Sequence, residues 1–444
     1  MGLYIQMHSM HGLFRSENLE LGRDEDTGGQ IVYVLELAKA LAGSKEVDEV
    51  EIVTRRIIDD NYPGYSEKIE NISKNLRIVR IDCGPKRYIK KVNLWPFLQE
   101  FISNTKGYIS KKARVPDIFQ SNYADSGIVC AKLSKHYKKS QVHTGHSLGI
   151  PKMQRLGVNK DNYSDFDKIY RFSRRIKAEQ QAIDNSSVII GSTMEEIRQQ
   201  YSGYKADKEK FRNIAPGVDL KKFYPPGKKS SLEEKHTYGL LDNVLGQCLR
   251  NPEKKILAVL TRLDKRKNIH GLLNAFGKNK ALQKIANLMV FTNTLSPENQ
   301  KTVDMINSII RRYDLYGKVA LPGIKLDYDK DVPAFYRFLA IKKGVFVNPA
   351  LIEPFGLTVL EASSSGVPVA ATKYGGPSEI ITDNLNGLLL DVRKPGHMST
   401  KLKAIAEDED LWKKISCNAV KNVRYNYSWK SAAKRYIRIF KSLI

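Results

Sequence analysis

Short runs of apolar and β-branched residues alternate with amphipathic stretches of helical periodicity along most of this chain. This alternation predicts parallel βαβ units, because parallel strands must be joined by a crossover that is usually a helix. In the first half we expect strands at residues 3–7, 50–54, 77–81, 117–120, 141–143 and 188–190, and helices at 30–41, 124–136, 167–183 and 194–201. The first half is therefore expected to form an α/β domain with a parallel sheet.

The alternation stops at residues 214–229 (IAPGVDLKKFYPPGKK), where proline, glycine and lysine gather. Such a stretch is typical of a linker. The pattern then restarts, with strands expected at 256–260, 288–291, 345–348, 367–371 and 387–390 and helices at 269–276 and 299–313. The last segment, 428–444, has the apolar spacing of an amphipathic helix. A chain of 444 residues also suits two domains of about 200 residues each. We therefore predict an α/β fold with two Rossmann-like, doubly wound domains facing a cleft.

Composition narrows the class of protein. With 41% hydrophobic and 27% charged residues, the chain can build large cores. No apolar run reaches the roughly 18–20 residues of a membrane span, so we expect none. The four cysteines lie far apart, without the spacing of a zinc site or a disulfide framework, which favours the cytoplasm. The net charge of +25 is scattered in pairs of lysine or arginine without a nucleic-acid-binding signature, so no nucleic acid is expected as a partner.

Two polar segments close to predicted helices carry candidate chemistry. Gly28, Gly29 and Gln30 open the first helix, where free N–H groups would meet an anion; a tight turn with left-handed glycines is the alternative. Arg262 and Lys267, in TRLDKRKN, follow a strand of the second half. An arginine and a lysine placed in this way would clamp a diphosphate, or would form a solvated basic loop.

Two further segments complete the candidate site. In EPFGLTVLE, Glu353 precedes a helix and Glu361 lies inside it among apolar residues, where a carboxylate needs a hydroxyl or cation as a partner. Capping or ion pairing would also account for both glutamates. In HTGHSLG, His143 and His146 lie at the end of a strand of the first half, a position that favours a site over a structural role. All four segments are expected at the carboxyl ends of strands, and their cations and carboxylates suit a sugar nucleotide whose diphosphate leaves.

The same segments carry a resemblance to a known family. GRDEDTGGQIVYVLELAKAL, TGHSLG, TRLDKRKN and EPFGLTVLEA resemble the retaining glycosyltransferases of the GT-B fold. Within them, LWPF, YDLYGKVALP, KGVFVNPALIEPFGL and ATKYGGPSEI resemble the sucrose-phosphate synthase family. The similarity runs from about residue 4 to residue 440. It implies an acceptor-binding domain at residues 1–213, on which the helix 428–444 packs back, and a sugar-nucleotide domain at residues 214–427.

The resemblance also implies roles for the donor-side residues. Arg262 and Lys267 would hold the diphosphate, Glu361 the ribose, and Glu353 the hydroxyls of the donor sugar. His146 would lie against that sugar near the reacting carbon. Further donor contacts would come from Gly29, Phe355, Gly356, Leu357 and Thr358. No metal or other cofactor is expected, so Asp24, Glu25 and Asp26 are interpreted as an acidic loop and not as a metal-binding motif.

The acceptor side follows from the resemblance in the same way. Gly28 and Gln30 would hold a fructose moiety, and its 6-phosphate would lie among Lys91, Ser147, Lys152 and Arg175. Three cations and one hydroxyl suit a dianion. Two positions stay open, because Arg174 competes with Arg175 and Lys90 competes with Lys91.

The implied reaction transfers glucose from UDP-glucose to fructose 6-phosphate, giving sucrose 6-phosphate and UDP with retention at the anomeric carbon. A mannosylfructose-phosphate synthase that uses GDP-mannose, or another hexosyltransferase of the family, is the alternative. A catalytically silent sugar-nucleotide sensor belongs to a different class, but Arg262, Lys267, Glu353 and Glu361 are all present. The expected partners are a sugar nucleotide and a sugar phosphate, and the oligomeric state is left open.

Overall fold

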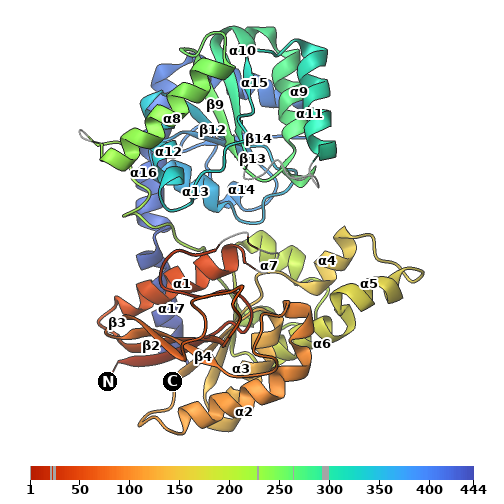
Figure 1. Ribbon diagram of the computed structural model, residues 1–444, viewed down its shortest axis with the longest axis vertical. Coiled ribbons are helices and arrows are strands. Elements are labelled where there is room, and N and C mark those ends of the chain that lie inside the picture. Colours follow the sequence, from red (N-terminus) through yellow and green to blue (C-terminus); the bar gives the residue numbers. More distant parts are fainter. Residues whose placement is uncertain (1, 21–22, 24–26, 228–229, 264, 293–299) are drawn as a thin grey trace. The chain divides into compact units, whose positions relative to one another are not determined.

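The computed structural model describes residues 2–444 except 21–22, 24–26, 228–229, 264 and 293–299. The chain divides into two compact units: Met1–Gly217 with Trp429–Ile444, and Val218–Ser428 (Figure 1). Each unit contains one sheet in which neighbouring strands are parallel, apart from one antiparallel pair in the first unit. The α/β class with two Rossmann-like domains is thus confirmed. The acidic segment Asp24–Asp26 lies outside the described residues.

The first unit is built on a sheet of the order β3-β4-β2-β1-β5-β6-β7-β8. Its strands are β1 (Leu3–His8), β2 (Val47–Arg55), β3 (Ile69–Ser73), β4 (Leu76–Ile81), β5 (Ile118–Asn122), β6 (Ser140–Thr144), β7 (Val188–Gly191) and β8 (Phe211–Asn213). All six predicted strands are present. The sequence analysis missed β3 and β8, because these short edge strands are largely solvent-accessible and carry no continuous apolar run.

Helices cover both faces of this sheet. They are α1 (Gly29–Ala42), α2 (Leu98–Ile109), α3 (Tyr123–Tyr137), α4 (Gly149–Arg155), α5 (Tyr163–Tyr170), α6 (Phe172–Asn185), α7 (Met194–Gln200) and α17 (Trp429–Lys441). Apolar residues of α1 and α17 share one core with alternate residues of β1, β2 and β4, and α2 and α3 pack on the other face. The apolar stripe of α17, including Trp429, Tyr436 and Phe440, is buried in the first of these cores.

The expected single helix at residues 167–183 is wrong. The helix is interrupted at Arg171, which adopts a left-handed conformation (φ 52°) between α5 and α6. The Asp167 carboxylate accepts hydrogen bonds from the N–H and the hydroxyl of Ser173, at 2.7 and 2.8 Å. Asp167 therefore satisfies a free N–H of the second helix, and two shorter helices replace the long one.

The second unit is built on an all-parallel sheet of the order β11-β10-β9-β12-β13-β14. Its strands are β9 (Lys255–Leu260), β10 (Ala286–Phe291), β11 (Val319–Ala320), β12 (Val345–Asn348), β13 (Val369–Thr372) and β14 (Leu388–Leu390). The direction in which strands are added reverses between β9 and β12. In open α/β sheets, ligands bind outside the carboxyl ends of the strands at such a switch point.

The helices of this unit also form two layers. They are α8 (Leu232–Cys248), α9 (Ile269–Lys278), α10 (Lys280–Ile285), α11 (Gln300–Tyr313), α12 (Asp331–Ile341), α13 (Leu357–Ser364), α14 (Pro377–Ile380), α15 (Pro395–Glu407) and α16 (Glu409–Asn426). Alternate residues of β9 enter two separate cores, one shared with α8, α12 and α13, the other with α9, α11 and α15. Across the described ranges of both units, none of the helices combines the length and apolarity that crossing a membrane requires.

Candidate functional site

The loop between β12 and α13 holds Glu353 in a fixed backbone position. The Glu353 N–H donates to the Tyr374 carbonyl (3.1 Å), and the Gly376 N–H donates to the Glu353 carbonyl (2.9 Å). Gly375 has a φ of 104°, and a Cβ there would lie 2.1 Å from the Glu353 carbonyl oxygen. The glycine pair in KYGGPSE is therefore required by close backbone packing, which orients the Glu353 side chain.

Lys267 and Glu353 meet at the carboxyl ends of β9 and β12. Lys267 Nζ lies 2.8 Å from Glu353 Oε2, and Asn348 Nδ2 donates to the same oxygen at 3.3 Å. Both charged side chains are partly exposed, so each remains accessible to a ligand. An ammonium group has three donors, and the contact with Glu353 leaves two of them for an anion.

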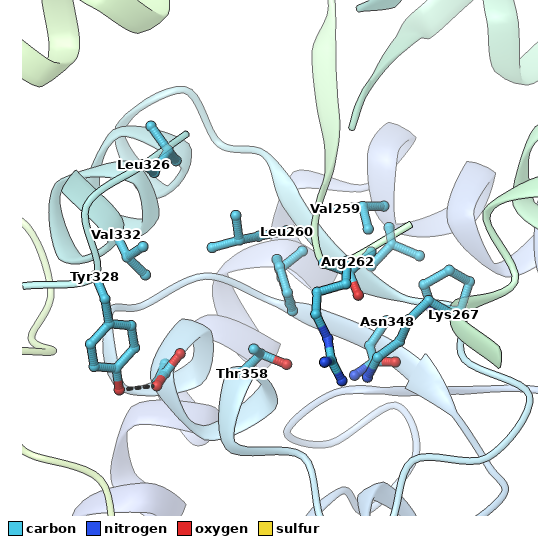
Figure 2. Close-up of a pocket in the computed structure, with 14 residues that line it drawn as sticks. Val259, Leu260, Arg262, Lys267, Leu326, Tyr328, Val332, Asn348 and Thr358 are labelled. Carbon is cyan, nitrogen blue, oxygen red and sulfur yellow. Dashed lines mark hydrogen bonds between the residues drawn. The ribbon is translucent and has the colours of Figure 1, made fainter. Parts of the chain in front are cut away.

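Arg262 follows β9 and lines a pocket with Lys267, Thr358 and Glu361 (Figure 2). The pocket has a volume of about 260 Å³. The structure thus brings together four residues that the sequence analysis assigned to a sugar nucleotide. Its walls come from both sides of the topological switch point of the second sheet.

Glu361 is a buried carboxylate of α13, with 5% of its surface exposed. Its Oε1 accepts a hydrogen bond from the Tyr328 hydroxyl at 2.8 Å, drawn in Figure 2, and its Oε2 accepts one from the Tyr336 hydroxyl at 3.4 Å. Burial raises the pKa of Glu361, and the two hydroxyls and the charge of Lys222 oppose this shift. The hydroxyl partner that the sequence analysis demanded is therefore supplied by tyrosines it did not name.

The other predicted donor residues lie at the start of α13. Gly356 has a φ of 104° and precedes the first residue of the helix, Leu357. Gly356 is thus the N-cap of α13, and the N–H groups of the first turn face the N-terminal side of the helix. Thr358 in the first turn lines the pocket beside Arg262 and Lys267.

His146 of the first unit follows β6 in a left-handed conformation (φ 56°). Its Nε2 lies 2.9 Å from the Asn122 side-chain oxygen, and its ring meets the Tyr33 ring edge-on at 4.9 Å. Burial, with smaller contributions from His143 and His11, lowers the pKa of His146 to about 3. The imidazole is therefore neutral near pH 7, which suits a hydrogen bond to a sugar hydroxyl.

Arg175 and Ser147 form one cluster. The Arg175 Nη2 donates to the Ser147 carbonyl (2.7 Å) and lies 3.2 Å from its hydroxyl, and its Nε donates to Glu179 at 2.8 Å. Arg175 is 4% exposed, whereas Arg174 is exposed and lines a different hollow. Of the two arginines, the structure places Arg175 beside Ser147.

The sequence analysis missed Tyr123, whose ring contacts two of the residues expected to bind the acceptor phosphate, Lys91 and Arg175. Its ring lies 4.8 Å from the Arg175 guanidinium, 5.6 Å from Lys91 Nζ and 4.7 Å from the His11 ring. It opens α3 with a φ of 74°, a conformation that is rare for an aromatic residue and clusters at functional sites. Only the position directly after a predicted central strand could have indicated it.

The remaining acceptor candidates occupy separate elements. Lys152 of α4 lies over the Tyr170 ring at 4.0 Å. At the start of α1, Gly28 has a φ of −124°, so the alternative of a left-handed glycine turn is wrong there. Neither Gly28 nor Gly29 would bring a Cβ within 4 Å of a described atom, and Gln30 donates to Ser9 at 3.0 Å. The glycines thus leave open space at the amino end of α1.

The described residues include no group of three or more histidine, cysteine, aspartate or glutamate side chains that would hold a metal ion. The candidate site has two parts: the pocket of the second unit that Arg262 and Lys267 line, and the cluster of Lys91, Arg175 and Ser147 in the first unit.

Comparison with known protein families gives a match for each half of the chain. The family model of glycosyl transferases group 1 matches residues 246–422, and that of the sucrose synthase first GT-B domain matches residues 3–208. Sucrose-phosphate synthase of Zea mays is 35% identical over 98% of this chain and 47% of its own length. Over nearly all of its length, the chain is thus similar to sucrose-phosphate synthases.

Further relatives support the same grouping. Probable sucrose-phosphate synthase 1 of Oryza sativa subsp. indica is 34% identical over 98% of this chain and 46% of its own length. The chain thus spans about half the length of these curated relatives. The solved structure of sucrose-phosphate synthase from Thermosynechococcus elongatus covers 99% of both chains with a TM-score of 0.73 and 25% identity. Anabaena HepE in complex with UDP-glucose shares the fold alone, at 16% identity, a TM-score of 0.65 and coverage of 99% of this chain and 100% of its own.

Proposed function

We propose that this protein is a retaining hexosyltransferase that moves glucose from UDP-glucose to fructose 6-phosphate, forming sucrose 6-phosphate and UDP. The observation that carries the proposal is the pocket shared by Arg262, Lys267, Thr358 and Glu361 at the switch point of the second sheet. The similarity of the chain to sucrose-phosphate synthases supports this pair of substrates. A GDP-mannose-dependent synthase with the same acceptor is the alternative within the family.

On the donor side, Arg262 and Lys267 would bind the diphosphate and stabilise the charge that develops as the glycosidic bond breaks. A guanidinium fork and an ammonium on one pocket wall suit two neighbouring phosphates. The buried Glu361 carboxylate would accept hydrogen bonds from the ribose hydroxyls, beside the Tyr328 hydroxyl that already bonds to it. Glu353 would orient the hydroxyls of the donor sugar, with Phe355, Gly356, Leu357 and Thr358 close by.

On the acceptor side, Lys91, Lys152, Arg175 and Ser147 would bind the 6-phosphate of the acceptor. Arg175 already meets Ser147, and Tyr123 lies against both Arg175 and Lys91. Gly28, Gly29 and Gln30 would contact the sugars where the amino end of α1 leaves room. A dianion held by several cations would favour the phosphorylated acceptor over free fructose.

In the chemical step, the bond from the anomeric carbon to the diphosphate would break as the acceptor oxygen approaches from the same face. The departing phosphate oxygen would take the proton of the acceptor hydroxyl, so the configuration is retained. Neutral His146 would hydrogen-bond to the donor sugar, and no residue of this chain would carry the proton. We propose that the reaction needs no metal ion, and full activity in EDTA is the expected result.

The test is a matrix of donors and acceptors with the purified protein. UDP-glucose, ADP-glucose and GDP-mannose are each combined with fructose 6-phosphate and with fructose, and nucleotide release and product mass are measured. The expected result is a phosphorylated disaccharide from UDP-glucose and fructose 6-phosphate, and no product from the other five pairs. Turnover with GDP-mannose alone would replace the proposed donor but keep the acceptor assignment. Failure of all six pairs, with UDP still bound, would favour a sugar-nucleotide sensor.

A further inference from the structure

A second hollow in the first unit is lined by side chains outside the acceptor set proposed above. It has a volume of about 530 Å³, and two chain segments, residues 85–97 and 167–174, form its walls. Arg87, Arg171 and Arg174 are its basic lining residues, and we call it the triple-arginine pocket. All three side chains are exposed, so water screens their mutual repulsion, and together they make the lining of the hollow basic.

The carboxylates near the triple-arginine pocket neutralise this charge only in part. Asp167 lines the pocket, but both of its oxygens accept hydrogen bonds from Ser173 (2.7 and 2.8 Å). Asp59, near Arg87, accepts the Tyr88 N–H at 2.9 Å and is partly exposed. Within the described ranges, no ion pair joins Arg87, Arg171 or Arg174 to a carboxylate closer than 4 Å. Three guanidinium groups against two carboxylates leave a net positive charge.

The walls of the pocket are held by bonds within the protein. The buried Arg55 guanidinium donates to the carbonyls of Cys83 (3.1 Å), Arg87 (2.7 Å) and Pro85, and so fixes the segment that carries Arg87. On the opposite wall, Arg171 donates its N–H to the Asp167 carbonyl at 2.8 Å and precedes the 14-residue helix α6. The arginines therefore project from a prearranged backbone, next to the positive end of a helix.

The triple-arginine pocket is distinct in its lining from the acceptor cluster, although the same segments contribute to both. Arg175 turns toward Ser147 and Tyr123, whereas its neighbour Arg174 lines the pocket. Lys91 lies over Tyr123, whereas its neighbour Val92 lines the pocket. Consecutive residues thus face two different places, as expected where side chains turn by about 100° per residue in an α-helix and about 120° in a 3-10 helix.

We propose that the triple-arginine pocket binds a phosphate dianion, either free or as the phosphate group of a small ester. Planar guanidinium groups pair with two phosphate oxygens at once, which makes arginine the residue suited to this ligand. Apolar side chains of the pocket, including Val92 and Phe97, would contact the organic part of an ester. This site is additional to the catalytic one and does not depend on the identity of the donor or acceptor.

The experiment measures binding of inorganic phosphate to the full chain by isothermal titration calorimetry at low ionic strength, in the parent protein and in Lys91→Ala/Lys152→Ala, which removes two cations of the proposed acceptor site. One phosphate is expected to bind to both proteins, and Arg87→Ala/Arg174→Ala should weaken this event roughly tenfold or more, since the two substitutions remove charged hydrogen bonds. Arg87→Lys/Arg174→Lys keeps the charge but loses the forks and should give an intermediate affinity. Glycerol 3-phosphate in place of inorganic phosphate then tests the ester.

The matched control is Arg198→Ala/Arg424→Ala, which removes two exposed arginines from α7 and α16. Equal weakening in this control would mean general attraction by a basic protein and would overturn the proposal. Unchanged binding in Arg87→Ala/Arg174→Ala would overturn it as well. So would the loss of every binding event in Lys91→Ala/Lys152→Ala. Circular dichroism and the melting temperature show whether each variant is folded. If Arg87→Ala/Arg174→Ala does not fold, the weaker phosphate binding expected of Arg87→Lys/Arg174→Lys is the test.

Discussion

At the scale of single residues, the candidate site consists of charged groups whose partners determine what they are able to do. Lys267 is paired with Glu353 but accessible, Glu361 is buried with two tyrosine hydroxyls, and His146 is kept neutral. Each of these states follows from local burial and hydrogen bonding. Each therefore gives a prediction for a single substitution.

Lys267→Ala should lower kcat by about 100-fold to 1000-fold, because it removes a preformed positive charge from the proposed leaving group. The measurement is steady-state UDP release with UDP-glucose and fructose 6-phosphate. Lys265→Ala, an exposed neighbour in the same turn, is the control and should retain activity. A kcat within a few-fold of the parent protein would contradict the assignment of Lys267.

Glu361→Gln should weaken UDP binding roughly tenfold or more, since it replaces a charged hydrogen-bond acceptor at the proposed ribose site. The dissociation constant of UDP, measured by calorimetry, is the readout. Tyr328→Phe is the companion variant, because it removes the hydroxyl that bonds to Glu361 at 2.8 Å without changing the carboxylate. An unchanged affinity in Glu361→Gln would exclude Glu361 from the ribose site.

Glu361 also gives a pH prediction. Its pKa is raised in the folded protein by burial, so the folded state binds this proton more tightly than the unfolded chain does. The charged carboxylate therefore lowers stability as the pH rises above the unfolded-state pKa, and the loss is complete above the folded-state pKa. Glu361→Gln should raise the melting temperature of the ligand-free protein more at pH 8 than at pH 5. An equal effect at both pH values would contradict this.

Tyr123→Leu should raise the KM for fructose 6-phosphate several-fold while kcat and UDP affinity change little. The reason is that the Tyr123 ring lies against Arg175 and Lys91, and contacts of this kind contribute about 0.5–2 kcal/mol each. Tyr123→Phe keeps the ring and should retain the parent KM. A parallel fall of kcat and UDP affinity in Tyr123→Leu would indicate general damage to the fold.

At the scale of elements, the clearest difference between expectation and structure is the break between α5 and α6. Helical periodicity continues through residues 167–183, but Asp167 bonds to Ser173 and Arg171 turns into the left-handed region. The spacing of apolar residues predicts which face of a helix is buried. It does not predict that a side chain will accept a hydrogen bond from a backbone N–H and so end the helix. The break matters, because it places Arg171 and Arg174 on the wall of the triple-arginine pocket.

The helix α17 illustrates the opposite case, since its apolar spacing predicted its buried face. Phe440→Ala should destabilise the protein by about 3–5 kcal/mol, because it leaves a cavity where a fully buried ring packs against α1 and the sheet. Urea denaturation followed by circular dichroism measures the loss. Lys434→Ala, on the exposed face of the same helix, should change stability by less than about 0.5 kcal/mol.

At the scale of the whole molecule, the chain forms two units with separate cores. Saturating UDP should stabilise the second unit selectively, by about 2.7 kcal/mol at a concentration 100 times its dissociation constant. Differential scanning calorimetry of the full chain should show the transition of that unit moving to higher temperature. Cleavage by a protease at intermediate temperatures assigns each transition to its unit. A shift confined to the first unit would contradict the donor assignment.

The sequence by itself determined the α/β class, the number of domains and most strands, because burial of parallel strands and helices leaves a periodic record of apolar residues. It also singled out Arg262, Lys267, Glu353 and Glu361 as candidate donor-binding residues, whose roles stay predictions. Only the tertiary structure decided which side chains meet. The Tyr328 hydroxyl on Glu361, the Tyr123 ring on Arg175 and Lys91, and the separation of Arg174 from Arg175 join segments far apart in sequence or depend on helix register. Such contacts arise when the strands align and the loops at their carboxyl ends converge, and no local pattern records them.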